Sequence, residues 1–156
     1  QAGHLPAAAS CRQELMGYLR HFWRGPATVR RQLVVALTDC ALWQAPAEDG
    51  PWLADCVRQL SDTMDALPCL LELLAVVPEE AANRKVVVTA QRRSSFAAGM
   101  LQHTALVLEA LWKASQAGDQ FAIPALRACA RWLHLQHASA ALRAQKRTVG
   151  GAAGGG

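Results

Sequence analysis

The stretch that decides the fold is Leu67-Pro-Cys-Leu-Leu-Glu-Leu-Leu-Ala-Val-Val-Pro-Glu-Glu80. Its leucines and valines recur every three or four residues, a spacing typical of a buried helix face. Pro68 fits the first turn of a helix, where a backbone N–H has no partner to lose. Pro78 is expected to end the helix, which would leave Glu79 and Glu80 solvated in the connection beyond it.

The same spacing recurs on both sides of this stretch. A short run, Val86-Val-Val88, favours a strand by propensity, but it has no partner run elsewhere and is therefore interpreted as an extended loop. Every other apolar run follows the helical period. The predicted helices cover residues 11–23, 27–43, a short segment that begins at Pro51, 67–77, 91–116 and 121–136.

Six helices in sequence, paired at intervals of about 40 residues, have the period of HEAT-type repeats. The expected fold class is therefore all-α, an α-α superhelix of the HEAT or armadillo kind with about three helical hairpins. Periodicity alone leaves a six-helix bundle open. The expected organisation is an N-terminal edge over 1–9 without order, a repeat segment over 10–136, and a disordered Gly/Ala-rich tail over 137–156.

Composition excludes several classes of protein. The chain has 156 residues, 52% of them apolar, with 16 Lys and Arg against 12 Asp and Glu. Its longest apolar runs, such as 33–37 and 73–77, are far below the ~18 residues of a membrane span. The basic residues are dispersed, which argues against a nucleic-acid partner. Five single cysteines without a C-x-x-C pair indicate reduced thiols.

No catalytic or cofactor motif stands out in the chain. Phosphate loops, dinucleotide fingerprints and zinc-protease motifs are all absent from the sequence. His134 and His137 lie three residues apart, with Cys129 a turn away, and a metal site there is one alternative. Two histidines at a surface helix end explain the pattern better, so we expect no enzyme and no cofactor.

Two carboxylates lie within helices that are otherwise apolar. Asp39 and Glu72 each fall in the second helix of a predicted hairpin. Burying a carboxylate that has no hydrogen-bond or ion-pair partner would lower the stability of the fold, on the order of several kcal/mol. We therefore expect both to make polar contacts between repeats, with Arg127 or Arg131 as candidate partners.

A family resemblance rests on the leucine-rich stretch and on the segment C-terminal to it. The leucine-rich helix and its Val-Pro-Glu-Glu ending precede Arg84 and the Gln91-Arg-Arg93 start of a long helix. The block Gln32-Leu-Val-Val-Ala-Leu-Thr-Asp-Cys-Ala-Leu42 and the residues Arg127, Trp132 and Leu135 agree with the same pattern. Over residues 10–136 the chain resembles the N-terminal region of the importin-beta superfamily of nuclear transport receptors, of the transportin-SR and importin-thirteen type.

The resemblance implies a function as well as a fold. Members of the superfamily are HEAT-repeat solenoids that shuttle between nucleus and cytoplasm and carry protein cargo under control of the small GTPase Ran. It implies the GTP form of Ran as a partner, SR-type protein cargo, and nucleoporins as possible partners of a full receptor. Arg92, Arg93 and Arg31 are the candidate partner-binding residues, and for Arg92 and Arg93 an ion pair within the chain is the first assignment and a partner contact the second.

The matched pattern corresponds to only a few repeats of such a solenoid, so the sequence is expected to be a fragment of a receptor. The alternative is a helical-repeat scaffold that binds another protein without Ran or transport activity.

Overall fold

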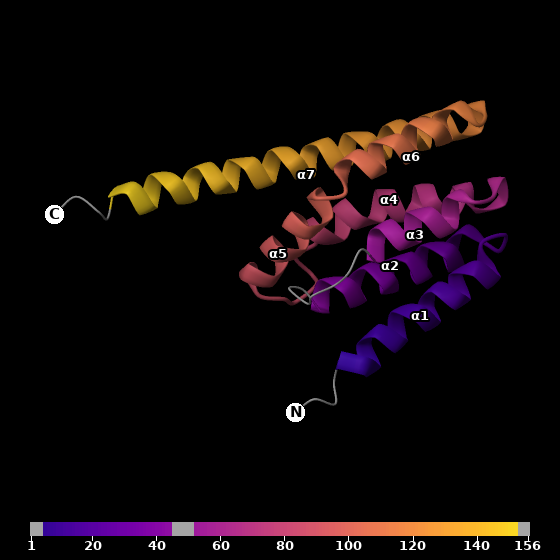
Figure 1. The fold of residues 1–156 in the computed structure, drawn as a ribbon, viewed down its shortest axis with the longest axis horizontal. Helices are drawn as coiled ribbons and strands as arrows, with labels where there is room; N and C mark the ends of the chain where they lie inside the picture. The colour runs from indigo at the N-terminus through magenta and orange to yellow at the C-terminus, as the bar shows by residue number, and fades with distance from the viewer. Residues whose placement is uncertain (1–4, 45–51, 153–156) are drawn as a thin grey trace.

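The computed structural model describes residues 5–44 and 52–152, and over these ranges the protein is all-α with no strand. Figure 1 shows antiparallel helix pairs stacked side by side, from α1 at one edge to α7 at the other. This confirms the expected α-α superhelix. The elements are α1 (Leu5–Phe22), α2 (Ala27–Gln44), α3 (Trp52–Ser61), the 3-10 turn η1 (Met64–Ala66), α4 (Leu67–Ala82), α5 (Ala90–Leu101), α6 (Thr104–Gln116) and α7 (Asp119–Ala152).

Three hairpins form the stack, namely α1 with α2, α3 with α4, and α6 with α7. The second helices of these hairpins, α2, α4 and α7, pack on one another in that order. α5 contacts all three of them, and it joins the second hairpin to the third. The second helices therefore form one continuous layer, as expected of stacked helical repeats.

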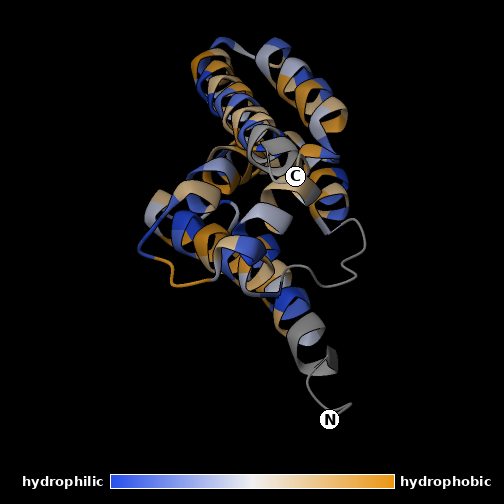
Figure 2. Ribbon diagram, turned by 90° about the vertical axis from the view of Figure 1, so that its left-hand side faces the viewer, coloured by the Kyte–Doolittle hydropathy of each residue, from blue (hydrophilic) through white to orange (hydrophobic). Residues whose placement is uncertain are grey.

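The core lies between the hairpins and is dominated by leucine and valine. In Figure 2 hydrophobic and hydrophilic residues are interleaved along the helices, as expected when each helix buries one face. α4 is the most completely covered helix, since most of its side chains are buried. The largest fully buried side chains are Trp132, Leu19, Leu37, Leu42, Leu53, Leu60, Leu70, Leu73, Leu74, Val34, Val76 and Val77.

The turn between α1 and α2 agrees with the Gly-Pro signal of the sequence. The Gly25 N–H donates to the Phe22 carbonyl at 2.8 Å, and a side chain on Gly25 would bring its Cβ to 3.0 Å from the same oxygen. The guanidinium of Arg30 donates a hydrogen bond of 2.7 Å to the Gly25 carbonyl. The tight approach therefore explains why a glycine precedes Pro26 at this corner.

α4 continues through Pro78 to Ala82, so the expectation that Pro78 ends the helix is wrong. Proline has no N–H and therefore cannot donate to the carbonyl four residues earlier, which is that of Leu74. Trp132 of α7 supplies the missing donor, because its indole Nε1 lies 2.7 Å from the Leu74 oxygen. A neighbouring helix thus satisfies the backbone group that the proline frees.

The predicted helix over 91–116 is two helices, α5 and α6, separated at Gln102 and His103. The His103 N–H bonds the Met100 carbonyl at 3.0 Å, and the Thr104 hydroxyl donates to the Leu101 carbonyl at 2.7 Å. These short-range bonds satisfy the end of α5 and let the chain change direction. The third hairpin is consequently α6 with α7. Val86–Val88 lies in the loop between α4 and α5, as expected.

Both end helices extend further than the sequence indicated. α1 begins at Leu5 rather than near residue 11, so the edge without order expected over 1–9 is corrected for residues 5–9, and its remainder, 1–4, lies outside the described residues. α7 runs to Ala152, which corrects the expected tail without order from 137 onward. Residues 138–147 are rich in Ala, Leu, Arg and Gln, which propagate a helix well once a packed segment has nucleated it. Residues 153–156 are outside the described part.

Within the described ranges, none of the helices combines the length and apolar character that a membrane crossing demands.

Candidate inner-face interface

A ladder of charged side chains crosses the layer formed by α2, α4 and α7. Arg31 of α2 binds two carboxylates of α4, with its Nη1 2.8 Å from Glu72 Oε1 and its Nη2 2.9 Å from Glu79 Oε2. Arg131 of α7 binds the other oxygen of Glu79, Oε1, at 2.5 Å. We call Arg31, Glu72, Glu79 and Arg131 the inner ladder, and it joins all three hairpins.

The inner ladder results from residue spacing on α4. Glu72 and Glu79 are seven residues apart, which places them two turns apart on the same helix face. The two arginines approach that face from opposite sides, because α2 and α7 flank α4. Arg31 therefore forms ion pairs with both carboxylates, while Arg131 pairs with the second oxygen of Glu79.

The inner ladder is only partly shielded from solvent. The side chains of Arg31 and Arg131 are 47% and 41% exposed, and those of Glu72 and Glu79 are 22% and 30% exposed. Hydrogen bonds to Glu72 and then to Glu79 raise the pKa of Arg31, which remains charged under all ordinary conditions. Two arginines and two glutamates balance in charge, and the exposed guanidinium edges remain open to a partner.

The structure differs from the expected pairing of Glu72. Its partner is Arg31, which the sequence singled out only as a partner-binding residue, while Arg131 binds Glu79 and the Ala75 carbonyl at 3.3 Å. Arg127 is exposed on α7, one turn before Arg131. Sequence reasoning missed Glu79 because it placed this residue beyond the helix. The seven-residue interval between Glu72 and Glu79 could have identified Glu79, because it places both carboxylates on one face of a continuous helix.

Asp39 lies at the same junction as the inner ladder but has a different environment. Its carboxyl on α2 faces the carboxyl of Glu80 on α4, which is buried and also accepts a bond of 2.9 Å from the Asn83 amide. Burial first, and then the charge and hydrogen bond of Glu80, raise the pKa of Asp39 to about 6. Asp39 Oδ1 is buried and has no hydrogen-bond partner within the described residues. Asp39 therefore meets another acid rather than an arginine.

Arg93 is used inside the chain. Its guanidinium donates to the carbonyls of Glu80 at 3.2 Å, Ala81 at 2.9 Å and Val86 at 2.7 Å. The last carbonyls of a helix have no donor of their own, so Arg93 satisfies the end of α4 and fixes the loop after it. The guanidinium is thereby occupied by three backbone acceptors.

Arg92 also contacts its own chain. Its backbone N–H donates to the Thr89 hydroxyl at 3.2 Å, which caps α5, and its guanidinium carbon lies 6.0 Å from the centre of the Trp43 ring. This stacking joins the end of α2 to the start of α5. Trp43 is half exposed, so both side chains stand at the surface beside the second-helix layer.

The residues considered for a metal site do not form one. In the part of the chain that the structure describes, no three His, Cys, Asp or Glu side chains are grouped to hold a metal ion, and this includes His134, His137 and Cys129. None of the five cysteines, all of which lie within the described ranges, forms a disulfide. Burial raises the pKa of both Cys56 and Cys69 to about 12, so these two thiols stay protonated.

Comparison with known proteins identifies a relative of this chain by sequence. No family model matches the chain. Over 134 residues the chain is 32% identical to Transportin MOS14 of Arabidopsis thaliana, and the match covers 81% of this chain. It covers 13% of the length of that protein, so the chain spans a small part of this relative. The chain is therefore related to a transportin over most of its own length.

Proposed function

We propose that this chain forms part of the N-terminal arch of a nuclear transport receptor of the importin-beta superfamily and binds the GTP form of Ran. The protein is then a carrier rather than an enzyme, and it shuttles between nucleus and cytoplasm with protein cargo, SR-type cargo by resemblance. The similarity to a transportin supports this proposal. The single structural observation that supports it is the half-exposed inner ladder across α2, α4 and α7.

The position of the inner ladder suits a partner whose binding affects several repeats at once. A ligand seated over Glu79 touches groups that connect α2, α4 and α7. Rearrangement of those ion pairs changes how neighbouring hairpins are held together. Binding of one partner can then oppose binding of another, which is the linkage expected when Ran in its GTP form releases an import cargo.

Arg127 is the most informative residue to substitute when testing whether this surface binds a partner. It is exposed on α7 and lies four residues before Arg131, so both side chains project from one face of that helix. Arg31 and Arg131 stabilise the fold through their ion pairs, and changing them would confuse binding with stability. Arg92 and Arg93 have the same disadvantage, because each holds a part of its own chain.

The test is a calorimetric titration of the chain with Ran loaded with a GTP analogue and, separately, with GDP. We expect binding selective for the GTP form, and we expect Arg127→Glu to weaken it at least tenfold. Arg143→Glu, an exposed position further along α7, is the matched control and should bind as the unaltered chain does. Absence of binding to either form overturns the proposal and favours a scaffold without Ran.

A further inference from the structure

α7 has an apolar face that points away from the core of the protein. Ile123, Leu126 and Leu133 are 60%, 67% and 53% exposed, whereas Ala128 and Trp132 on the same helix are buried. A single exposed apolar side chain needs no explanation, but a continuous row of them is typical of a surface that binds a partner. The row on α7 is therefore a candidate docking surface.

The three large residues belong to a regular row of exposed positions. Along α7 these positions recur at alternating intervals of three and four residues, which is the spacing that one helix presents to another in a coiled coil. The row, which we call the outer stripe, consists of Ile123, Leu126, Ala130, Leu133, His137 and Ala140. It covers about 26 Å of helix. Figure 1 shows α7 at the edge of the stack, with its C-terminal part extending past the other helices.

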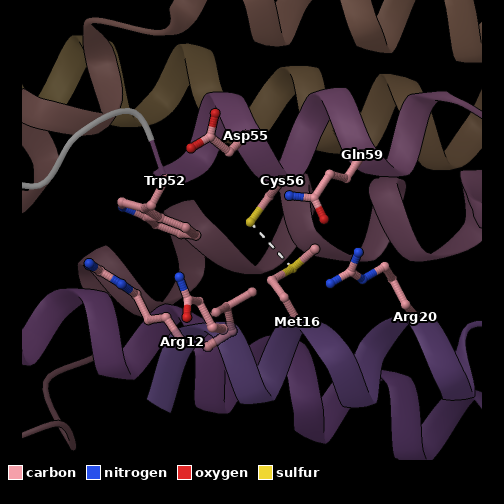
Figure 3. A pocket seen from close by; sticks show the side chains of 9 residues that line it. Arg12, Met16, Arg20, Trp52, Asp55, Cys56 and Gln59 are labelled. Carbon is pink, nitrogen blue, oxygen red and sulfur yellow. Dashed lines mark hydrogen bonds between the residues drawn. The ribbon is translucent and has the colours of Figure 1, made fainter. Parts of the chain in front are cut away.

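The first helices of the first two hairpins do not offer a comparable surface. α1 and α3 enclose a pocket of about 270 Å³, in which Met16 and Cys56 are both buried. The Cys56 thiol donates to the Met16 sulfur at 3.4 Å (Figure 3). Asp55 in the lining pairs with Arg58 at 2.8 Å, and Arg12 has an interaction of its own within the chain. The polar side chains of this pocket are therefore engaged by their own chain.

The outer stripe is narrow and has polar borders. Arg127 and His134 border it on one side and Gln136 and Arg143 on the other, and all four residues are exposed. A helix that lies on a membrane has a broader apolar face with bulky side chains, whereas a narrow row in three-four spacing fits along a second helix. The width of the outer stripe therefore favours a helical partner.

The charge of α7 indicates the kind of helix that fits. From residue 120 to residue 152 the helix contains no Asp or Glu, while Arg127 and Arg143 flank the outer stripe. Within the described ranges neither of these arginines forms an ion pair. A second copy of α7 would bring arginines close to arginines, whereas glutamates of a partner would pair with them. Charge complementarity therefore favours an acidic partner.

We propose that the outer stripe docks an acidic amphipathic helix of a partner protein, which packs lengthwise along α7. The partner helix presents leucine or a similar residue to the outer stripe, with glutamates beside it that face Arg127 and Arg143. Arg131, the residue that α7 contributes to the inner ladder, lies outside the outer stripe. The inference therefore goes beyond the proposed function and does not depend on Ran.

The first experiment is a calorimetric titration of the whole chain with a peptide of three repeats of Glu-Leu-Ala-Gln-Leu-Glu-Ala. Its glutamates repel one another across a homodimer, which keeps the peptide available. One comparison peptide replaces every Glu by Lys, and another keeps the composition but scatters the leucines around the helix. We expect both to bind at least tenfold more weakly, and we expect affinity for the first peptide to fall as salt rises. Equal binding of the Glu and Lys peptides overturns the proposal.

The second experiment uses variants of α7. Leu126→Gln and Leu133→Gln should each weaken binding of the acidic peptide at least fivefold, because each removes an apolar contact of the outer stripe. Leu142→Gln is the matched control, since Leu142 is 57% exposed on the same helix but lies outside the outer stripe. Circular dichroism of every variant checks that the helices are retained. Equal losses for Leu142→Gln and Leu126→Gln would overturn the site.

Two other occupants of the outer stripe would give different results. If a second copy covered it, sedimentation velocity would show a dimer that Leu126→Gln dissociates. If an anionic membrane covered it, the chain would co-sediment with phosphatidylserine vesicles and Leu126→Gln would abolish this. We expect a monomer, and we expect no effect of Leu126→Gln on sedimentation with vesicles. Either of the other results overturns the proposal.

The variant Leu126→Gln also separates this inference from the proposed function. It should bind Ran in the GTP form as the unaltered chain does, while it loses the acidic peptide. Failure of the peptide titration and failure of the Ran titration are therefore independent outcomes.

Discussion

The two junctions between successive hairpins share the ion pairs of the inner ladder but differ in a second contact. Where α4 meets α7, the buried Trp132 donates a neutral hydrogen bond of 2.7 Å to the Leu74 carbonyl. Where α2 meets α4, two carboxyl groups, those of Asp39 and Glu80, face each other. The first contact is independent of pH, whereas the second depends on whether the carboxyl of Asp39 is protonated. Adjacent repeats of similar shape can therefore respond differently to the same change in conditions.

The largest expected effect is at the α4–α7 junction. Trp132→Ala should lower the free energy of unfolding by about 4 kcal/mol, because it leaves a large cavity and removes the donor to Leu74. Urea denaturation monitored by circular dichroism measures it. Trp112→Ala is the matched control, since Trp112 is 67% exposed on α6 and should change stability by less than ~0.5 kcal/mol. Similar losses for both would show that Trp132 does not hold the junction.

A smaller effect is expected at the α2–α4 junction. The pKa of Asp39 is about 6 in the folded chain and near 3.8 when unfolded, so the folded state binds more protons between these values. Its contribution to stability is therefore present at low pH and is lost as pH rises through about 6. Asp39→Asn should raise the free energy of unfolding at pH 7 by about 1 kcal/mol, after allowance for solvent screening.

Denaturation of both proteins at intervals from pH 4 to pH 7 tests this sign. The advantage of Asp39→Asn should grow with pH over that range and then become constant, because only the unaltered chain loses the proton. A difference between the two proteins that does not change with pH would contradict a raised pKa of Asp39 at this junction.

The smallest effect concerns the coupling between Pro78 and Trp132. Pro78→Ala restores an N–H that can bond the Leu74 carbonyl within α4, so this carbonyl depends less on the indole. Trp132→Phe should therefore cost about 0.5 kcal/mol less in the Pro78→Ala background than in the unaltered chain. A double-mutant cycle by urea denaturation measures this difference. Additive costs would show that the proline and the indole are independent.

The sequence predicted the helices because they depend on local apolar spacing, whereas the superhelix was expected from the family resemblance, since the spacing alone also fits a six-helix bundle. The inner ladder could not be predicted in the same way, since its hydrogen bonds join Arg31 to residues 41 and 48 positions away. The assumption that Pro78 ends a helix also removed Glu79 from consideration. A proline inside a helix is tolerated here because a distant tryptophan supplies the lost donor, and local rules contain no such information.

The hydrogen bond from Trp132 to Leu74 also has a consequence for the order of folding. α4 cannot complete its own backbone bonds, because the Leu74 carbonyl is satisfied only after α7 has docked. A second hairpin formed alone would leave this carbonyl to water and would lack much of its packing surface. The second and third hairpins are therefore expected to form as one cooperative unit, with α4 amides that exchange slowly only when α7 is in place.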